Sequence, residues 1–171
     1  MILKSLTESQ YEQFCEYFQD APAWLIDKFI VEKIKKDKLL IRTGESVDTV
    51  YYLLKGVVKA TDHHVKDTSF DFMIFDSFHS LGGMEVIMGK ERYLASLRTI
   101  TDCMVLKIPS ILFDQWIKSD IQILYRETIR MSTYLLEQTR FTRLFLFLGS
   151  ADRLALLLKY GYEKYAQNGI W

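Results

Sequence analysis

The hydrophobic and polar positions of this chain follow two different rhythms. From about residue 30 to 109, short runs rich in Ile, Val, Tyr, Phe and Thr are separated by Gly, Asp and Ser about every ten residues. This rhythm is typical of an antiparallel β-sandwich or barrel. It predicts strands in FIVEKIKK, KLLIRT, TVYYLLK, VVKATD, DTSFDFMIF, YLASLRTIT and CMVLKI.

Helical spacing is found on both sides of this β region. Residues 7–19 predict a helix that Thr7 and Gln10 begin with a capping box, and AWLIDKF predicts a short helical turn. After Pro109, the pattern predicts a short helix in SILFDQWIK, a long one from Asp120 to about residue 148, and a last one in ADRLALLLKYGYEKYA. We expect Ser119 and Gln122 to begin the long helix with a second capping box. We therefore expect a β-barrel domain with N-terminal helices over 1–118, a long helix over 119–148 and a terminal helical segment over 149–171.

The long helix is apolar on two sides. One line of residues steps by threes and fours, as in a heptad seam, and consists of Ile121, Leu124, Thr128, Met131, Leu135, Gln138, Thr142 and Phe145. A second line, Tyr134, Phe141, Leu144 and Leu148, faces elsewhere. Since a domain of this size offers one core, we expect one face to lie on the barrel and the other to pair with the same helix of a second copy. The alternative is a helix wedged between the barrel and the terminal helix of its own chain.

Composition excludes several classes of protein. Lys and Arg number 22 and Asp and Glu also 22, so no global positive field gathers nucleic acid. Cys15 and Cys103 are the only cysteines and form no C-x-x-C motif, and no apolar run approaches the roughly 20 residues that span a bilayer. We expect a soluble, cytoplasmic protein without disulfides or metal.

The segment SLGGMEVIMGKERYLASLRTIT, residues 80–101, has the composition of an anion cradle. Gly82 and Gly83 let backbone N–H groups approach a phosphate, Arg92 offers a two-pronged contact to its oxygens, and Glu85 offers an acceptor for a sugar hydroxyl. The other interpretation is an ordinary surface turn.

Three motifs resemble the sensor half of the cyclic-AMP receptor protein/fumarate–nitrate regulator family, Crp/Fnr. TGESVDTVYYLLKGVVKAT matches the family's glycine-bounded strand pattern through Gly44, Tyr51 or Tyr52, Gly56 and Val58. The 80–101 segment sits where the family keeps its phosphate-binding cassette, and FLGSADRLALLLKYG is similar to its hinge and first DNA-domain helix. The resemblance implies a mainly β fold with flanking helices: a double-stranded β-helix, or jelly-roll barrel, followed by a long dimerisation helix. It also implies a homodimeric regulator of transcription.

The cassette departs from the cyclic-nucleotide-binding pattern. The acid's position, after Gly82, is Gly83, and Glu85 would lie roughly 6–7 Å further along an extended chain. The arginine's position falls on Tyr93, while Arg92 reaches it only if the turn is one residue shorter, and the two cannot face the pocket together. The adenine-reading pair falls near Gln138 and Thr139. We therefore expect an effector other than cyclic AMP.

By resemblance, the effector would contact Gly82, Gly83, Glu85, Arg92, Tyr93 and Ser96, with Gln138 and Thr139 from the partner helix. A ligand-free dimeric interaction module is the alternative, because Tyr93 and Leu94 could themselves fill the pocket. In the family, a winged helix follows the segment that ends here at Trp171, so we expect DNA contact only through a C-terminal domain that this chain lacks.

Other chemistry has little support in the sequence. His63 and His64 are adjacent, so in a strand they point to opposite faces and cannot bind one metal ion together. His79 lacks a C-x-x-C-H motif for haem, and no G-x-S-x-G motif marks a nucleophile. Cys103 lies in a predicted buried strand, where a thiol is an inert packing group. We expect no enzymatic activity and no cofactor.

Overall fold

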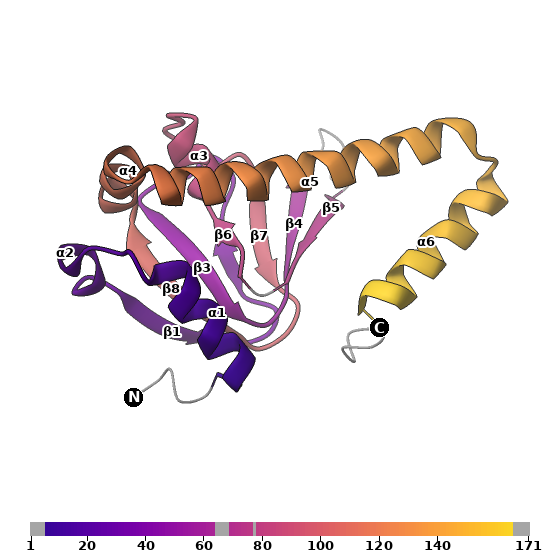
Figure 1. The fold of residues 1–171 in the computed structure, drawn as a ribbon. Coiled ribbons are helices and arrows are strands. Elements are labelled where there is room, and N and C mark those ends of the chain that lie inside the picture. Colours follow the sequence, from indigo (N-terminus) through magenta and orange to yellow (C-terminus); the bar gives the residue numbers. More distant parts are fainter. Residues whose placement is uncertain (1–5, 64–68, 77, 166–171) are drawn as a thin grey trace. The chain divides into compact units, whose positions relative to one another are not determined.

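A computed structural model describes residues 6–63, 69–76 and 78–165 (Figure 1). Its internal contacts divide the chain into residues 1–124 and 125–171, and each unit is described by itself. The elements in chain order are α1 Glu8–Phe18, α2 Ala23–Ile26, β1 Ile30–Ile34, β2 Leu39–Ile41, β3 Thr49–Lys55, β4 Val58–His63, β5 Ser69–Phe75, β6 Ser80–Leu81, α3 Gly83–Ile87, β7 Ser96–Thr99, β8 Cys103–Pro109, α4 Ser110–Ser119, α5 Ile121–Phe147 and α6 Ser150–Tyr165.

The strands form two antiparallel four-stranded sheets. Their orders are β1-β8-β3-β6 and β2-β7-β4-β5, so chain neighbours such as β3 and β4 belong to different sheets (Figure 1). This alternation between sheets is the double-stranded β-helix that the sequence predicts. The predicted jelly-roll fold, with flanking helices and a long helix after the β-core, is confirmed.

Helices cover the outer face of the first sheet. Tyr52 and Leu106, from β3 and β8, are fully buried there against Phe18 of α1 and Phe113 and Trp116 of α4. The helix α1 begins at Thr7, whose side chain and that of Gln10 form the predicted capping box. The first turn of α5 joins this cluster through Ile123 and Leu124.

A second apolar cluster fills the space between the sheets. Leu53 and Val105 of the first sheet pack there with Ala60 and Leu97 of the second, and all four are buried. Because strand residues alternate between faces, β1, β3 and β8 of the first sheet supply both clusters. The barrel interior is therefore closely packed around these residues.

Two elements and one helix cap differ from the sequence prediction. The short strand β6 and the five-residue helix α3 lie in the 80–95 segment, where we expected only a turn. The long helix is capped by Asp120, whose carboxylate accepts from the N–H of Gln122 at 2.9 Å. Ser119 instead donates to the carbonyl oxygen of Trp116 at 3.0 Å, so a cap at Ser119 is wrong.

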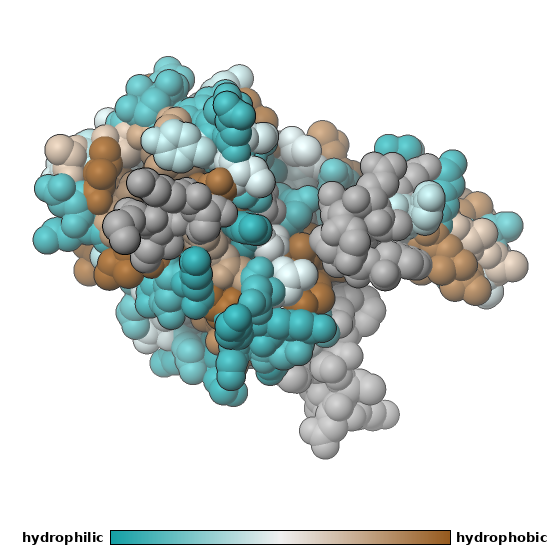
Figure 2. Space-filling model, turned by 90° about the horizontal axis from the view of Figure 1, so that it is seen from below, coloured by the Kyte–Doolittle hydropathy of each residue, from teal (hydrophilic) through white to brown (hydrophobic). Residues whose placement is uncertain are grey.

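The second unit consists of α5 from Tyr125 onward and α6. Several large hydrophobic side chains of this unit are exposed to solvent, among them Tyr125, Ile129, Leu136, Phe147 and Leu158. Figure 2 shows hydrophobic side chains, in brown, at the end where α5 is followed by α6. No described helix is both long and apolar enough to cross a membrane.

The hydroxyl of Thr99 holds the β1–β2 turn against β7. This side chain is 1% exposed, and its Oγ1 donates to the carbonyl oxygen of Lys35 at 2.8 Å and accepts from the N–H of Lys38 at 2.9 Å. The turn needs such support because Asp37 has a φ of 63°, in the left-handed region that residues with a side chain rarely adopt. The backbones of Asp37 and Lys38 are also hydrogen-bonded to that of Thr99.

We predict that Thr99→Val lowers the free energy of unfolding by about 1–3 kcal/mol, because the turn's N–H and C=O lose a buried partner without a change in side-chain volume. Thr99→Ser keeps the hydroxyl and should cost less. Urea unfolding of both variants tests this, and an equal loss in the two would contradict a role for the hydroxyl.

Candidate functional site

In the cassette, residues 80–101, the chain turns away from the first sheet at a glycine that other residues cannot easily replace. After β6, Gly82 has a φ of 86° and precedes the first turn of α3. A Cβ at this position would lie 2.9 Å from Cε1 of Tyr93 and 3.2 Å from the carbonyl oxygen of Thr49. The close approach of Tyr93 and the left-handed backbone both favour glycine.

The position of the family's acid holds no side chain and has little room for one. Gly83 is buried, and a Cβ there would lie 2.6 Å from Oγ of Ser80 and 3.3 Å from Cζ of Phe113. Phe113 is fully buried in the outer cluster, so it cannot move aside without disturbing the core. The sequence shows that the acid is missing, and the structure adds the steric reason.

Glu85 is buried but is directed to the backbone of the cassette. It lies in α3, so the extended geometry that we considered for it is wrong. Its Oε1 accepts from the N–H of Leu94 at 3.2 Å, and the side chain is 8% exposed. Glu85 thus joins the helix of the cassette to its returning segment, and this carboxylate oxygen is engaged within the protein.

Tyr93, and not Arg92, faces the interior. The ring of Tyr93 is 7% exposed and packs in the cluster between the sheets. Its hydroxyl donates to the carbonyl oxygen of Thr49 at 2.5 Å and accepts from the N–H of the same residue at 3.3 Å. Arg92 is exposed, and its guanidinium donates to the carbonyl oxygen of Gly44 at 2.7 Å. A phosphate clamp by Arg92 inside the barrel is therefore absent from this arrangement.

The loop 43–49 is the partner of the cassette. The N–H of Tyr93 donates to the carbonyl oxygen of Glu45, and the N–H of Gly44 donates to that of Tyr93, both at 2.9 Å. Ser96 is buried, and its Oγ accepts from the N–H of Thr43 at 3.1 Å. Sequence reasoning missed this loop as part of the site. Gly44 was noted only as part of the glycine-bounded strand pattern, and its link to residue 93 has no sequence signal.

Burial raises the pKa of Tyr93 to about 12. The hydrogen bond to the Thr49 backbone opposes this rise, and the nearby Tyr51, Asp48 and Glu85 add to it. The phenol therefore stays protonated throughout the physiological range and can serve as a stable donor. It cannot act as a base or a nucleophile there.

The other predicted effector residues lie in the second unit. Gln138 donates from Nε2 to the hydroxyl of Tyr134 at 3.2 Å, and Thr139 donates to the carbonyl oxygen of Leu135 at 2.8 Å. Both contacts are local to α5. The structure brings Gly82, Gly83, Glu85 and Tyr93 together within the first unit, while Arg92 lies on its surface.

The cysteine and histidine candidates of the sequence have no evident chemical role in the described residues. The thiol of Cys103 is buried as predicted, and this burial raises its pKa. His79 lies 3.2 Å from a carboxylate oxygen of Asp76. His63 ends β4, and His64 lies outside the described residues. Among the described residues, no three His, Cys, Asp or Glu side chains are grouped so as to hold a metal ion.

The jelly roll, its cassette and the long helix define a β-barrel sensor domain. Residues 31–120, a little over half of the chain, match the cyclic nucleotide-binding domain family, and the chain belongs to that family. No curated protein sequence matches it significantly.

Solved structures share the fold. The c-di-GMP-responsive global regulator CLP of Xanthomonas campestris is 21% identical, with a TM-score of 0.71 over 94% of this chain and 74% of CLP. The sensor domain of the transcriptional regulator DNR from Pseudomonas aeruginosa is 14% identical, with a TM-score of 0.61 over 78% of this chain and 95% of that domain. The regulatory subunit of a cAMP-independent protein kinase A from Trypanosoma brucei is 18% identical, with a TM-score of 0.56 over 69% of this chain and 46% of the subunit. The resemblance to the sensor half of Crp/Fnr regulators is thus confirmed for the fold.

We predict that Tyr93 makes the stability of the protein fall between pH 10 and pH 12. Its pKa in the folded protein lies above the ordinary value of 10, so the unfolded chain ionises first and gains stability as pH rises through this window. The stabilisation that Tyr93 provides through its raised pKa is complete below pH 10. About 2 kcal/mol of it is lost as the pH rises to 12.

Urea unfolding of the wild type and Tyr93→Phe at pH 9 and pH 11.5 measures this difference. The other tyrosines contribute equally to both proteins, so the difference in unfolding free energy between them should shrink at the higher pH. A difference that stays constant would show that the Tyr93 phenol titrates normally.

Proposed function

We propose that this chain is the sensor and dimerisation domain of a Crp/Fnr-like transcription regulator that does not respond to cyclic AMP. The single observation that carries the proposal is the state of the cassette: Tyr93 occupies the interior position where the family's pattern has an arginine. Membership of the cyclic nucleotide-binding domain family and the likeness to the regulators CLP and DNR support the regulatory, non-catalytic role.

The polar contacts that a cyclic nucleotide needs are missing or already used. The ribose hydroxyl would meet Gly83, which offers no carboxylate. The cyclic phosphate would meet the Tyr93 ring, whose hydroxyl is bonded to Thr49. A phosphate without a bidentate arginine loses a strong, charge-assisted contact. The cassette thus serves as a structural element in this protein.

Dimerisation would use the exposed apolar side chains of α5. Within the second unit, Tyr125, Ile129 and Leu136 are spaced by four and seven residues and lie along one line of the helix, next to Leu135. Leu135 and Leu136 are 66% and 70% exposed, which is costly for a helix without a partner. A second copy of the same helix can cover this surface in a symmetric pair.

The seam predicted from the sequence is only partly available for such a pair. Leu135 is exposed, and Ile121 is exposed at the start of α5, whereas Leu124 packs against the chain's own core. Thr128 and Thr142 are exposed, Met131 and Gln138 are partly buried, and the side chain of Phe145 is outside the described set. We therefore place the centre of the proposed interface on the line of Tyr125, Ile129 and Leu136.

In a regulator of this kind, the rest of a DNA-binding domain would follow α6, and the effector would act by favouring one arrangement of the dimer. A ligand does so only if it binds that arrangement more tightly than the other. The alternative, an interaction module without ligand, is favoured at the cassette by the buried Tyr93.

We predict that cyclic AMP at millimolar concentration does not raise the melting temperature of the wild type or of Gly83→Glu. A ligand at about 100 times its Kd would stabilise the native state by about 2.7 kcal/mol, a shift of several degrees. Gly83→Glu should itself be less stable by about 1–3 kcal/mol, because its side chain is forced against Ser80 and Phe113.

Met84→Glu is the matched control, because it adds the same group at the next, exposed position. It should melt close to the wild type. A saturable rise of several degrees with cyclic AMP in the wild type would overturn the proposed ligand preference.

We predict that the wild type sediments as a dimer at micromolar concentration and that Ile129→Glu combined with Leu136→Glu sediments as a 20.2 kDa monomer. Buried charges in an apolar interface are unpaired and strongly destabilise it. Met84→Glu, which adds the same charge at an exposed position outside α5, should remain dimeric. A monomeric wild type would remove the basis for the dimer.

A further inference from the structure

A groove of about 420 Å³ lies where β1 and β2 border the two sheets. Residues of β1, β2, β3 and β8 line it. The strand β1 is at one edge of its sheet, and β6, which leads into the cassette, is at the other (Figure 1). This volume is within the range of sites that hold a small organic molecule.

The inner wall of the groove is apolar. It includes Ile34 at the end of β1, Leu39 and Leu40 of β2, and the ring of Tyr51 on β3. Ile34, Leu40 and Tyr51 are half-buried and pack against the cluster between the sheets. Their position gives a ligand an apolar surface that is backed by a rigid core.

Lysine dominates the charged lining. Lys33, Lys35, Lys38 and Lys107 line the groove, and Glu32 is the one acidic residue of the lining. A cleft lined by an excess of one charge concentrates the field and attracts ions of the opposite sign. The groove therefore favours an anion.

Lys107 is the lysine of the lining that lies on the inward side of its sheet. In the register of the first sheet it lies beside Ile30 and Tyr51, on the side that faces the second sheet. Its Nζ is 3.2 Å from Oε2 of Glu32 and 5.9 Å from the centre of the Tyr51 ring, and its side chain is one-third exposed. An ammonium over an aromatic ring, on the inward side of a sheet, is a ready contact for an anion joined to an apolar body.

The β1–β2 turn is fixed before any ligand arrives. The Thr99 hydroxyl binds the backbones of Lys35 and Lys38, and Nζ of Lys35 pairs with Asp102 at 2.8 Å. The backbone at this rim is thus held in place, and preorganisation of this kind lowers the entropy cost of binding.

We infer that this groove binds a small organic anion, a carboxylate or phosphate attached to an aromatic or aliphatic body. The anion takes the place of Glu32 at Lys107, and the body lies on Tyr51 and the leucines of β2. Assigning this ligand as the effector rests on the proposed function, whereas binding itself does not.

Phenyl phosphate is a suitable probe. It is titrated into the full chain while the amide chemical shifts are recorded by NMR. We expect saturable shifts at Ile34, Leu40, Tyr51 and Lys107, with an affinity above that for phenol or inorganic phosphate alone. Phenol tests the apolar wall, and inorganic phosphate tests the lysines. Equal binding of inorganic phosphate and phenyl phosphate would contradict the combined site.

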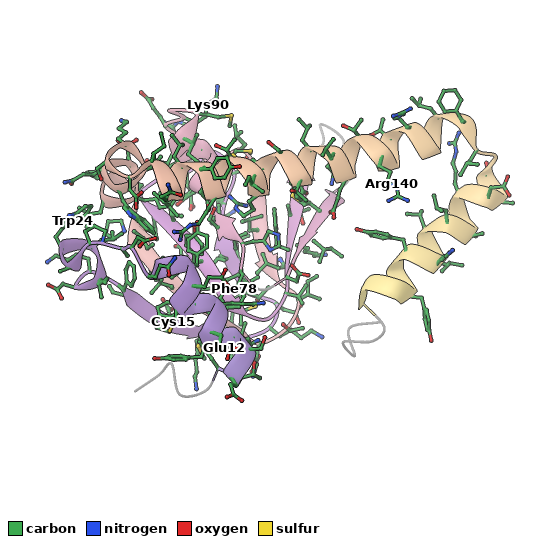
Figure 3. The ribbon with its side chains drawn as sticks, in the orientation of Figure 1. Glu12, Cys15, Trp24, Phe78, Lys90 and Arg140 are labelled. Carbon is green, nitrogen blue, oxygen red and sulfur yellow. The ribbon has the colours of Figure 1, made fainter. Side chains whose placement is uncertain are left out.

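Two substitutions should change affinity in opposite directions. Lys107→Met keeps most of the stem and removes the charge, so binding should weaken about tenfold. Glu32→Gln removes the competing carboxylate, so binding should tighten. Lys90→Met, at the outer tip of the cassette turn (Figure 3), is the control and should bind as the wild type does.

The absence of saturable shifts at these four residues, or unchanged affinity in both Lys107→Met and Glu32→Gln, would overturn the site. Amide spectra of the free variants show whether each is folded. Sedimentation of the same samples separates the two proposals: binding by a monomer keeps this site and removes the dimer, and a dimer without binding does the reverse.

Discussion

The hydrogen bond between the Tyr93 hydroxyl and the backbone of Thr49 is the contact on which the rest of the cassette depends. It places the ring between the sheets, where it packs with Leu81 and Leu97. Because neighbouring residues in an extended segment face opposite sides, Tyr93 inside means Arg92 outside. Arg92 then binds the carbonyl oxygen of Gly44, and the backbone of loop 43–49 joins that of the cassette.

The family fold can combine a rigid barrel framework with a site for a cyclic nucleotide. The barrel and its cassette form the framework, and on the proposed function internal contacts stand where a cyclic-nucleotide site would have its polar groups. Glu85 shows this most directly, since a buried carboxylate in the cassette accepts from the protein's own backbone. The charged groove at β1 and β2 lies on the barrel itself and is built from side chains outside the cassette.

Much of the fold could be predicted because its elements are long enough to show a period. The barrel strands and α1 were predicted in this way, and so was the existence of α5. The strand β6 and the helix α3 were not, because two and five residues are too short for a period to appear. The cap of α5 was misplaced by one residue because Ser119 and Asp120 are both good capping residues, and the sequence does not show which one has its side chain free.

The candidate site could be predicted only as far as it depends on which residues occupy neighbouring positions in the chain. The absence of an acid at Gly83 and the competition between Arg92 and Tyr93 are visible in the sequence. The lack of space around Gly83 depends on Ser80 and Phe113, and the second of these is thirty residues away. The groove was missed because its lining is spread from residue 32 to residue 107, and only the sheet register brings Glu32, Tyr51 and Lys107 together.

The crowding at Gly83 also constrains how this protein could change over evolutionary time. Placing an acid there for a nucleotide requires a smaller neighbour in place of Phe113 or a shift of Ser80, together with loss of the tyrosine at 93. Each of these changes alone removes packing and supplies no binding in return. On the proposed function, a descendant that senses cyclic nucleotides is therefore several unfavourable steps away.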